Sequence, residues 1–134
     1  MAQALRNVRE VEKLSEKLSG RIPKIYGGLC HKLPVLVRAC GLCQTVAFLE
    51  AKSESKDRER AEAYLRMCGH VKEMLEKHGG VKVAAQTLSE AVAGLEIREY
   101  SFATRCILQA WVFYKRFAES ILKVANAQED EHGS

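Results

Sequence analysis

Apolar residues recur every three or four positions along the C-terminal part of the chain, from Ile97 to Ala125, for about four heptads. The full set is Ile97, Tyr100, Thr104, Ile107, Trp111, Tyr114, Ala118, Ile121 and Ala125. Such spacing places the side chains on one side of an α-helix. An apolar seam of this length must pack against another helix, in the same domain or in another chain. The sequence therefore predicts a long C-terminal helix in an all-α protein.

The first third of the chain also shows helical patterns. Residues 4–19 carry an apolar stripe, and Gly20 is suited to end that helix. Pro23 fits the first turn of a short helix, and Pro34 the first turn of the next, because a proline pushes the preceding residue out of helical geometry. The pair Gly27-Gly28 either weakens the first of these helices or lets another part of the chain approach closely.

The middle of the chain predicts three more helical segments. The helix that begins at Gly41 is apolar nearly all round, which predicts a central, buried position. Asp57 is suited to N-cap the next helix, which ends at Gly79-Gly80. Its expected inward stripe is Ala61, Tyr64, Leu65, Cys68, Val71, Met74 and Leu75. A further helix begins either at residue 81 or near 88, where Thr87-Leu88-Ser89-Glu90 matches a capping box.

Length and composition narrow the class of protein. A chain of 134 residues fits one domain, expected over residues 1–127, followed by a tail over 128–134 that is expected to be acidic and disordered. No run approaches the ~18 apolar residues of a membrane span, and the N-terminus lacks the apolar block of a signal peptide. We therefore expect no membrane association and an intracellular, cytoplasmic location. The predicted core includes Leu42, Phe48, Tyr100, Trp111 and Tyr114.

Charge is distributed unevenly along the chain. The tail carries three acidic residues and no Lys or Arg, so removing them from the net charge of +4 leaves about +7 on the body. Within residues 21–50, Glu50 alone opposes four basic residues, Arg21, Lys24, Lys32 and Arg38. This balance suits an RNA or phosphate partner, although many domains of similar charge bind no nucleic acid.

Candidate catalytic and metal-binding residues do not form a recognisable site. Cys40-Gly41-Leu42-Cys43 is a C-x-x-C segment, but a redox motif of this kind needs a βαβ setting and a zinc site needs a second ligand pair. Small buried hydrophobic residues are the favoured interpretation of the five cysteines, with redox or metal binding as the alternative. The histidines lack an H-x-x-x-H spacing. We therefore expect a protein with no enzymatic activity, metal or cofactor.

The C-terminal helix carries a second pattern, opposite its apolar seam. At about 100° per residue, the side chains of Arg98, Arg105, Gln109, Arg116 and Lys123 fall within about 20° of one line. Such a row can follow a phosphate backbone. The alternative is a solvated face with ordinary ion pairs such as Glu119–Lys123.

Lys115, beside Arg116, completes the candidate RNA-backbone contacts. Aromatic residues are not expected to interleave with the basic row, because Tyr100, Trp111 and Tyr114 belong to the seam. Stacking on nucleobases is therefore not predicted for this face. Phe113 stands off both faces and is a candidate contact for a protein partner.

Several short motifs resemble those of one known family. A leucine-proline pair, Leu33-Pro34, precedes the segment Gly41-Leu42-Cys43-Gln44-Thr45-Val46-Ala47-Phe48. Tyr100 and the segment Trp111-Val112-Phe113-Tyr114-Lys115-Arg116-Phe117-Ala118-Glu119 follow. In order and spacing they resemble the small helical subunit of the type III-B CRISPR RNA-targeting complex (the Cmr complex), from about Tyr26 to Glu119. Cys40 departs from the pattern, since a polar residue such as Asn is expected there, and the acidic tail is not part of it.

The resemblance implies a fold of about six helices and a structural subunit without catalytic activity. It also implies partners: copies of the chain stack in a minor filament beside the repeated backbone subunits, which hold the guide RNA and cut the target. A basic face would turn toward the paired guide and target RNA. The alternatives are a type III-A small subunit, a stand-alone helical adaptor or self-associating scaffold with no RNA contact, and a cysteine-based redox or metal protein.

Overall fold

The computed structural model describes residues 1–17 and 20–125, which form six helices and, within these ranges, no strand. The helices are α1 Ala2–Lys17, α2 Arg21–Cys40, α3 Leu42–Lys52, α4 Arg58–Lys77, α5 Leu88–Ala93 and α6 Ile97–Ser120. The predicted all-α fold with a long C-terminal helix is confirmed. The acidic tail predicted over residues 128–134 lies outside the described residues.

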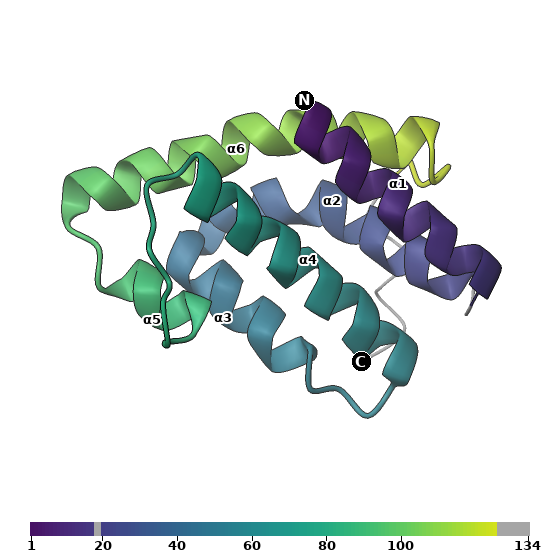
Figure 1. Cartoon of the computed structure of the whole chain (residues 1–134), viewed down its shortest axis with the longest axis horizontal. Helices are drawn as coiled ribbons and strands as arrows, with labels where there is room; N and C mark the ends of the chain where they lie inside the picture. The colour runs from purple at the N-terminus through teal and green to yellow at the C-terminus, as the bar shows by residue number, and fades with distance from the viewer. Residues whose placement is uncertain (18–19, 126–134) are drawn as a thin grey trace.

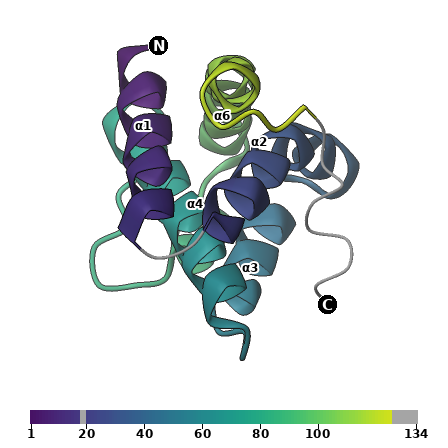
Figure 2. The ribbon, with the colours of Figure 1, turned by 90° about the vertical axis from the view of Figure 1, so that its right-hand side faces the viewer.

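Helix α2 lies at the centre of the bundle and packs against α1, α3, α4 and α6. Helices α3 and α4 pack against each other on one side of α2, and α6, the longest helix, crosses on another side beside α1 (Figure 1). Figure 2 views α6 nearly along its axis, with α2 and α3 below it. The short helix α5 packs on α3. Because α6 covers only one edge of the bundle, its opposite side is free to face a partner.

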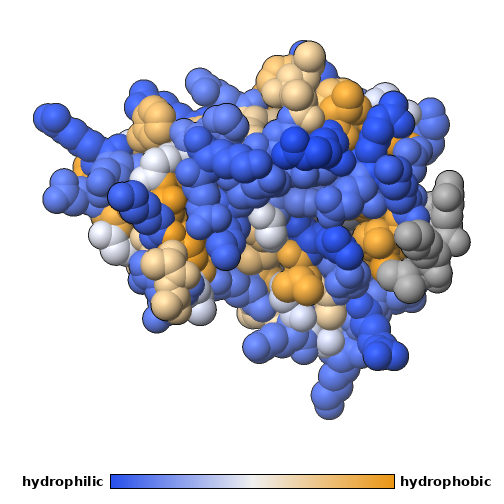
Figure 3. Space-filling view, viewed as in Figure 1, coloured by the Kyte–Doolittle hydropathy of each residue, from blue (hydrophilic) through white to orange (hydrophobic). Residues whose placement is uncertain are grey.

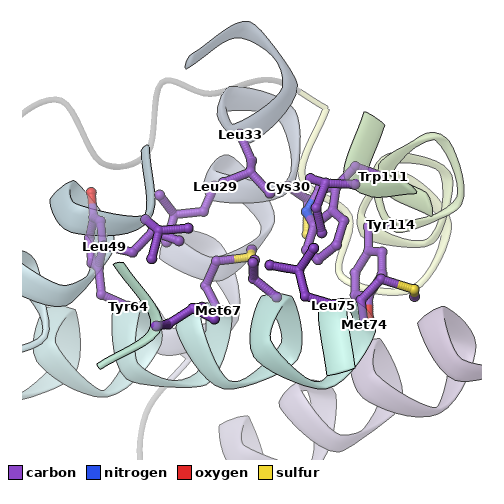
Figure 4. Close-up of a cluster of buried hydrophobic side chains, with 14 of the residues drawn as sticks. Leu29, Cys30, Leu33, Leu49, Tyr64, Met67, Met74, Leu75, Trp111 and Tyr114 are labelled. Carbon is purple, nitrogen blue, oxygen red and sulfur yellow. The ribbon is translucent and has the colours of Figure 1, made fainter. Parts of the chain in front are cut away.

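The core fills the space between α2, α4 and α6 (Figure 4). The largest fully buried side chains include Tyr26, Leu29, Leu33, Leu42, Leu49, Tyr64, Met67, Leu75, Ile107, Trp111 and Tyr114. Trp111 and Tyr114 stack, with ring centroids 3.9 Å apart and an angle of 8° between the ring planes. Of the five predicted core residues, Leu42, Trp111 and Tyr114 are fully buried, whereas Phe48 and Tyr100 are half-buried at the edge of the core.

The two short helices predicted at Pro23 and Pro34 are wrong, because α2 is one helix of 20 residues with Pro34 inside it. A proline inside a helix removes one backbone hydrogen bond. Here the flanking residues Leu33 and Val37 are buried against other helices, and this packing outweighs the local preference. The prediction that α3, which is apolar nearly all round, is central and buried is also wrong: the helix buries one side, and Gln44 and Ala51 are exposed.

The end of α6 differs from the prediction that the helix continues to Ala125. The helix ends at Ser120, and Lys123 adopts a positive φ of 62°. The chain turns there because Val124 packs onto α2. A Cβ added at Gly27 would lie 2.7 Å from the Val124 side chain, and the Val124 carbonyl lies 2.9 Å from His31 Nε2. Gly27 therefore allows a close approach, the second of the two roles predicted for Gly27-Gly28.

Side-chain caps lie at the starts of three helices, α4, α5 and α6. The Asp57 side chain accepts hydrogen bonds from the backbone N–H groups of Glu59 and Arg60, as predicted for an N-cap of α4. Thr87 forms a capping box with Glu90, so α5 begins at Leu88 rather than at residue 81. On α4, Leu65 is 57% exposed and is not part of the inward stripe.

Gly41 joins α2 to α3 with φ 88° and ψ 161°. Its N–H donates to the Val37 carbonyl at 2.9 Å, and its carbonyl accepts from the Thr45 hydroxyl at 2.8 Å. Glycine offers no side chain to cap α3, and the Tyr100 hydroxyl of α6 takes this role by accepting from the Cys43 N–H at 3.0 Å. A backbone joint and a side chain from a distant helix thus hold the start of α3.

Candidate nucleic-acid interface

The outer side of α6 carries the basic row predicted from the sequence. Arg98, Arg105 and Arg116 are exposed, and Gln109 lies exposed between the last two. The opposite side of the helix is buried at Ala103, Ile107, Trp111, Tyr114 and Ala118. Burial of that seam orients the helix and turns the arginines outward. We refer to Arg98, Arg105, Gln109 and Arg116 as the α6 stripe.

The arginines of the α6 stripe lack carboxylate partners among the described residues, as does Lys115. The nearby acids are directed elsewhere. Glu99 accepts from the Glu96 N–H at 3.0 Å in the capping box that starts α6, and Glu119 lies 3.9 Å from His31 Nε2. The Arg116 guanidinium lies 6.0 Å from the centre of the Phe113 ring. Uncompensated guanidinium groups on a rigid helix can bind phosphate oxygens without first breaking an ion pair.

Two candidate residues do not lie on this stripe. Lys123 is exposed but follows the end of α6, so its predicted place on the helical line is wrong, and no Glu119–Lys123 ion pair forms between these two described residues. Lys115 is half-buried and precedes Arg116 by one residue, which is about 100° of rotation. Its side chain therefore lies on the flank of α6, between the stripe and the buried seam, rather than within the stripe.

Exposed apolar side chains lie near the arginines, and one of them, Phe102, is aromatic, contrary to the expectation that no aromatic residue would interleave with the basic row. Ile97, Phe102 and Val112 are 84%, 51% and 45% exposed. Phe102 also lines a pocket of about 730 Å³ with Met1 and with residues of α1, α4 and α6, among them Met74, Arg105, Cys106 and Phe113. Figure 3 shows the face of the molecule that carries α1 and α4 as mostly hydrophilic, with several separate hydrophobic areas, one of them near the start of α1. Phe102 follows Arg98 by four residues and so lies only about 40° from its line on the helix. Counting this rotation from the sequence would have placed Phe102 beside the arginines.

A buried polar network connects α1, α2, α4 and α6, and sequence reasoning missed it. The Tyr26 hydroxyl lies 2.6 Å from His70 Nδ1, and His70 Nε2 lies 3.6 Å from Glu10 Oε1. Elsewhere on α1, Asn7 Nδ2 donates to the Tyr114 hydroxyl at 2.8 Å and to Glu73 Oε1 at 3.1 Å. These contacts join residues far apart in sequence, so no local pattern marks them.

Burial in this network lowers the pKa of His70 below its usual 6.5, against the opposing effect of Glu10 and Glu73. The folded protein thus binds the His70 proton less readily than the unfolded chain. The contribution to stability is fully present above pH about 6.5 and is lost as the pH falls through the lower folded pKa. We predict that the free energy of unfolding in urea decreases as the pH falls below about 6.5, and that His70→Gln removes much of this dependence.

His78→Gln is the matched variant, because it removes an exposed histidine that lies near the end of the same helix and outside this network. Carboxyl groups do not mimic the effect near neutral pH, because those with shifted pKa values are shifted downward, away from this range; the pKa of Asp57, for example, is lowered by its hydrogen bond from Arg21. An unchanged slope in the His70 variant would contradict the assignment.

The five cysteines, all among the described residues, are free thiols. Within residues 1–17 and 20–125 there is no group of three or more His, Cys, Asp or Glu side chains placed to hold a metal ion. Burial raises the pKa of Cys68 to about 11 and that of Cys30 well above its usual range. These two thiols therefore stay protonated at neutral pH, in the form that is a poor nucleophile. No helix of the described part is long and apolar enough to cross a bilayer.

Comparison with known proteins decides between the families considered. The sequence pattern of the family described as CRISPR-associated protein (Cas_Cmr5) matches residues 1–121. The chain belongs to the Cmr5 family. A curated relative, the CRISPR system Cmr subunit Cmr5 of Thermus thermophilus, is 29% identical over 112 residues, which cover 84% of this chain and 88% of the relative. The resemblance seen in the sequence motifs is confirmed, in favour of the type III-B family over the type III-A alternative.

The structure assigns a place to each of the sequence motifs that resemble the Cmr5 family. Gly41, at the start of the first motif, lies under the hydroxyl of Tyr100, the tyrosine of the long helix. The second motif supplies Trp111 and Tyr114 to the core and Arg116 to the stripe. Most of these motif residues thus have a structural role, while Arg116 makes no buried contact that would account for its place in the motif.

Proposed function

We propose that this Cmr5-family chain is a non-catalytic structural subunit of a cytoplasmic type III-B Cmr complex. In this proposal, copies of the chain stack in a minor filament beside the repeated backbone subunits that hold the guide RNA. The α6 stripe then lies along the sugar-phosphate backbone of guide or target RNA. Recognition is by charge and shape, and base pairing between the two RNAs supplies the sequence specificity.

The row of unpaired arginines on α6 is the observation that carries this proposal. From Arg98 to Arg116 the helix rises about 27 Å, at about 1.5 Å per residue. The side chains are spaced about 10 and 16 Å apart along the axis, so each reaches a different phosphate. A single rigid helix can therefore make several separate phosphate contacts, whose combined effect on affinity depends strongly on salt.

Replacement of Arg98, Arg105 and Arg116 together by Glu tests the proposal. Folding should change little, because exposed charges without partners contribute little to stability. Target-RNA binding by the reconstituted complex should weaken, and the slope of log affinity against log salt should fall by about 2, at about 0.7 per single-strand phosphate contact. A control variant that replaces the exposed residues Lys72, Lys77 and Lys82 together by Glu should bind target RNA with the affinity and salt slope of the parent complex.

Normal assembly of the variant with unchanged affinity and salt slope would contradict the proposal. The exposed apolar residues Ile97, Phe102 and Val112 support a second candidate, a protein-binding role for the same face, since arginine and aromatic residues are frequent in protein interfaces. Failure of the variant to assemble, with RNA binding by the isolated chain preserved, would favour that second role.

We also predict that the purified chain does not cut RNA, with or without a divalent cation. Metal-assisted cleavage requires a cluster of carboxylate or histidine ligands, and the described residues bring no such group together. The measurement is gel analysis of labelled RNA after incubation with Mg²⁺, Mn²⁺ or a chelator. Cutting that follows the protein through purification and is lost in a point variant would contradict the prediction.

A further inference from the structure

The hairpin of α2 and α3 presents a second basic surface, separate from the α6 stripe. Lys32, Leu36 and Cys40 follow one another at four-residue intervals on α2, and Gln44, Phe48 and Lys52 do so on α3. Residues four apart lie on the same side of a helix. Gly41 lets α3 fold back along α2, so the two rows border a common groove.

The groove has a cationic end and a polar end. Phe48 lies at the cationic end, where Lys32 Nζ is 5.3 Å and Lys52 Nζ is 5.9 Å from the centre of its ring. A pocket of about 310 Å³ extends from the ring toward the other end, lined by Leu36, Cys40, Gln44, Thr45 and Phe48. The ring is fixed in orientation by edge contact with buried Tyr64, at 5.7 Å between centroids and 77° between planes.

Neither ammonium group forms an ion pair with a described residue. Glu50 is the only acidic residue in the stretch 21–50, and its carboxylate binds the backbone N–H and hydroxyl of Ser89 on α5. Two positive charges therefore meet at one ring without a neutralising carboxylate. An anion at this end of the groove would supply the missing charge.

We infer that the α2–α3 groove binds one nucleotide of a single-stranded RNA. Phosphates lie on Lys32 and Lys52, and the base lies in the pocket against Phe48 and Leu36 with its polar edge toward Gln44. Aromatic rings in basic grooves accept bases of any sequence through their flat faces, and lysine binds phosphate as a point charge. The inference rests on the proposed role in an RNA complex and adds a contact to a base, which the α6 stripe lacks.

The mixed chemistry of the groove favours RNA over a protein partner. An acidic peptide would satisfy the two lysines but would leave the flat, half-buried ring and the adjoining pocket without a matching group. A nucleotide carries a phosphate and a flat, polar-edged ring within one unit, which fits the cationic end and the pocket together. The base contact therefore distinguishes this groove from a site of charge attraction alone.

The test measures binding of two fluorescein-labelled strands to the full chain by fluorescence anisotropy at low salt. One strand is a ten-nucleotide oligouridine, and the other is identical except that its sugars carry no base. Phe48→Leu keeps an apolar side chain on the core and should weaken oligouridine binding by about tenfold, within the range that loss of one stacked base produces. It should leave abasic binding unchanged. Lys32→Gln with Lys52→Gln should weaken binding of both strands and lower the salt slope by about 1.4.

The matched control replaces Lys72 and Lys82, which are exposed on α4 and on the segment before α5. Equal loss in this control and in the groove variant would overturn the inference, as would unchanged oligouridine binding in both groove variants. Absence of any binding by the parent chain at low salt would overturn it too. Groove variants that block assembly of the complex while oligouridine binding persists would assign the groove to a protein partner instead.

The outcome is separable from that of the proposed function, because the stripe and the groove are changed in different variants. Loss of oligouridine binding in the groove variants alone supports the groove, even if the stripe variant captures target RNA normally. Loss of target-RNA capture in the stripe variant alone supports the stripe and overturns the groove.

Discussion

Trp111→Ala is expected to lower the free energy of unfolding by about 3–5 kcal/mol, the range for truncating a large buried aromatic side chain. Trp111 is fully buried between α6 and the rest of the core and stacks face to face on Tyr114. Its removal leaves a cavity and also frees the Tyr114 ring, whose hydroxyl is held by Asn7 of α1. Since domains of this size are stable by about 5–15 kcal/mol, the loss is a large share of the total.

Urea unfolding followed by circular dichroism measures this effect. Trp111→Phe is the matched variant: it retains a ring on Tyr114, and the indole Nε1 has no hydrogen-bond partner among the described residues to lose. Its cost should be clearly smaller than that of the alanine variant. Phe102→Ala, on the exposed side of the same helix, should cost little. A cost below about 1 kcal/mol for Trp111→Ala would show that α6 is not packed as described.

Gly41→Ala should destabilise the protein by about 2–4 kcal/mol, the second-largest effect expected. Backbone angles of φ 88° and ψ 161° lie in a region that is essentially restricted to glycine, and forcing another residue there costs about 1–3 kcal/mol. The new Cβ would also lie 3.1 Å from the Tyr100 hydroxyl. Displacing that hydroxyl weakens its hydrogen bond to the Cys43 N–H at the start of α3, which adds about 1 kcal/mol.

Gly20→Ala provides the control, because Gly20 has φ −67° and no atom within 4 Å of an added Cβ. That substitution should be neutral or slightly stabilising. Tyr100→Phe isolates the hydrogen bond and should cost about 1 kcal/mol. Equal stabilities of the two glycine variants would contradict the role of Gly41 as the joint between α2 and α3.

Helical periodicity predicted the fold class because most of the helices bury one stripe of side chains at regular spacing. The same counting placed Arg98, Arg105 and Arg116 on one exposed line, since α6 is continuous through all three. It failed for Lys123, because the burial of Val124 against Gly27 ends the helix first. Contacts between distant segments override local preference, and the sequence carries no periodic signal for them.

Tertiary packing also explains the other differences. Pro34 does not break α2, because the helix is covered by four others and its interior position is held by their packing. The Tyr26–His70 contact joins α2 to α4 across 44 positions and has no local pattern. The only sequence feature that indicated the α2–α3 groove was the excess of basic over acidic residues within residues 21–50. The geometry of the groove depends on Gly41, which lets α3 fold back along α2 and so brings Lys32 and Lys52 to the same end.

Site-specific crosslinking tests the central claim, contact between the α6 stripe and RNA, most directly. A photoreactive amino acid at Gln109, exposed between Arg105 and Arg116, would be compared with the same group at exposed Glu54 on the segment between α3 and α4. In the assembled complex with labelled guide and target RNA, the group at Gln109 should crosslink to RNA, and the group at Glu54 should do so much less. Crosslinks from Gln109 to protein subunits alone, in a complex that captures target RNA normally, would contradict the account.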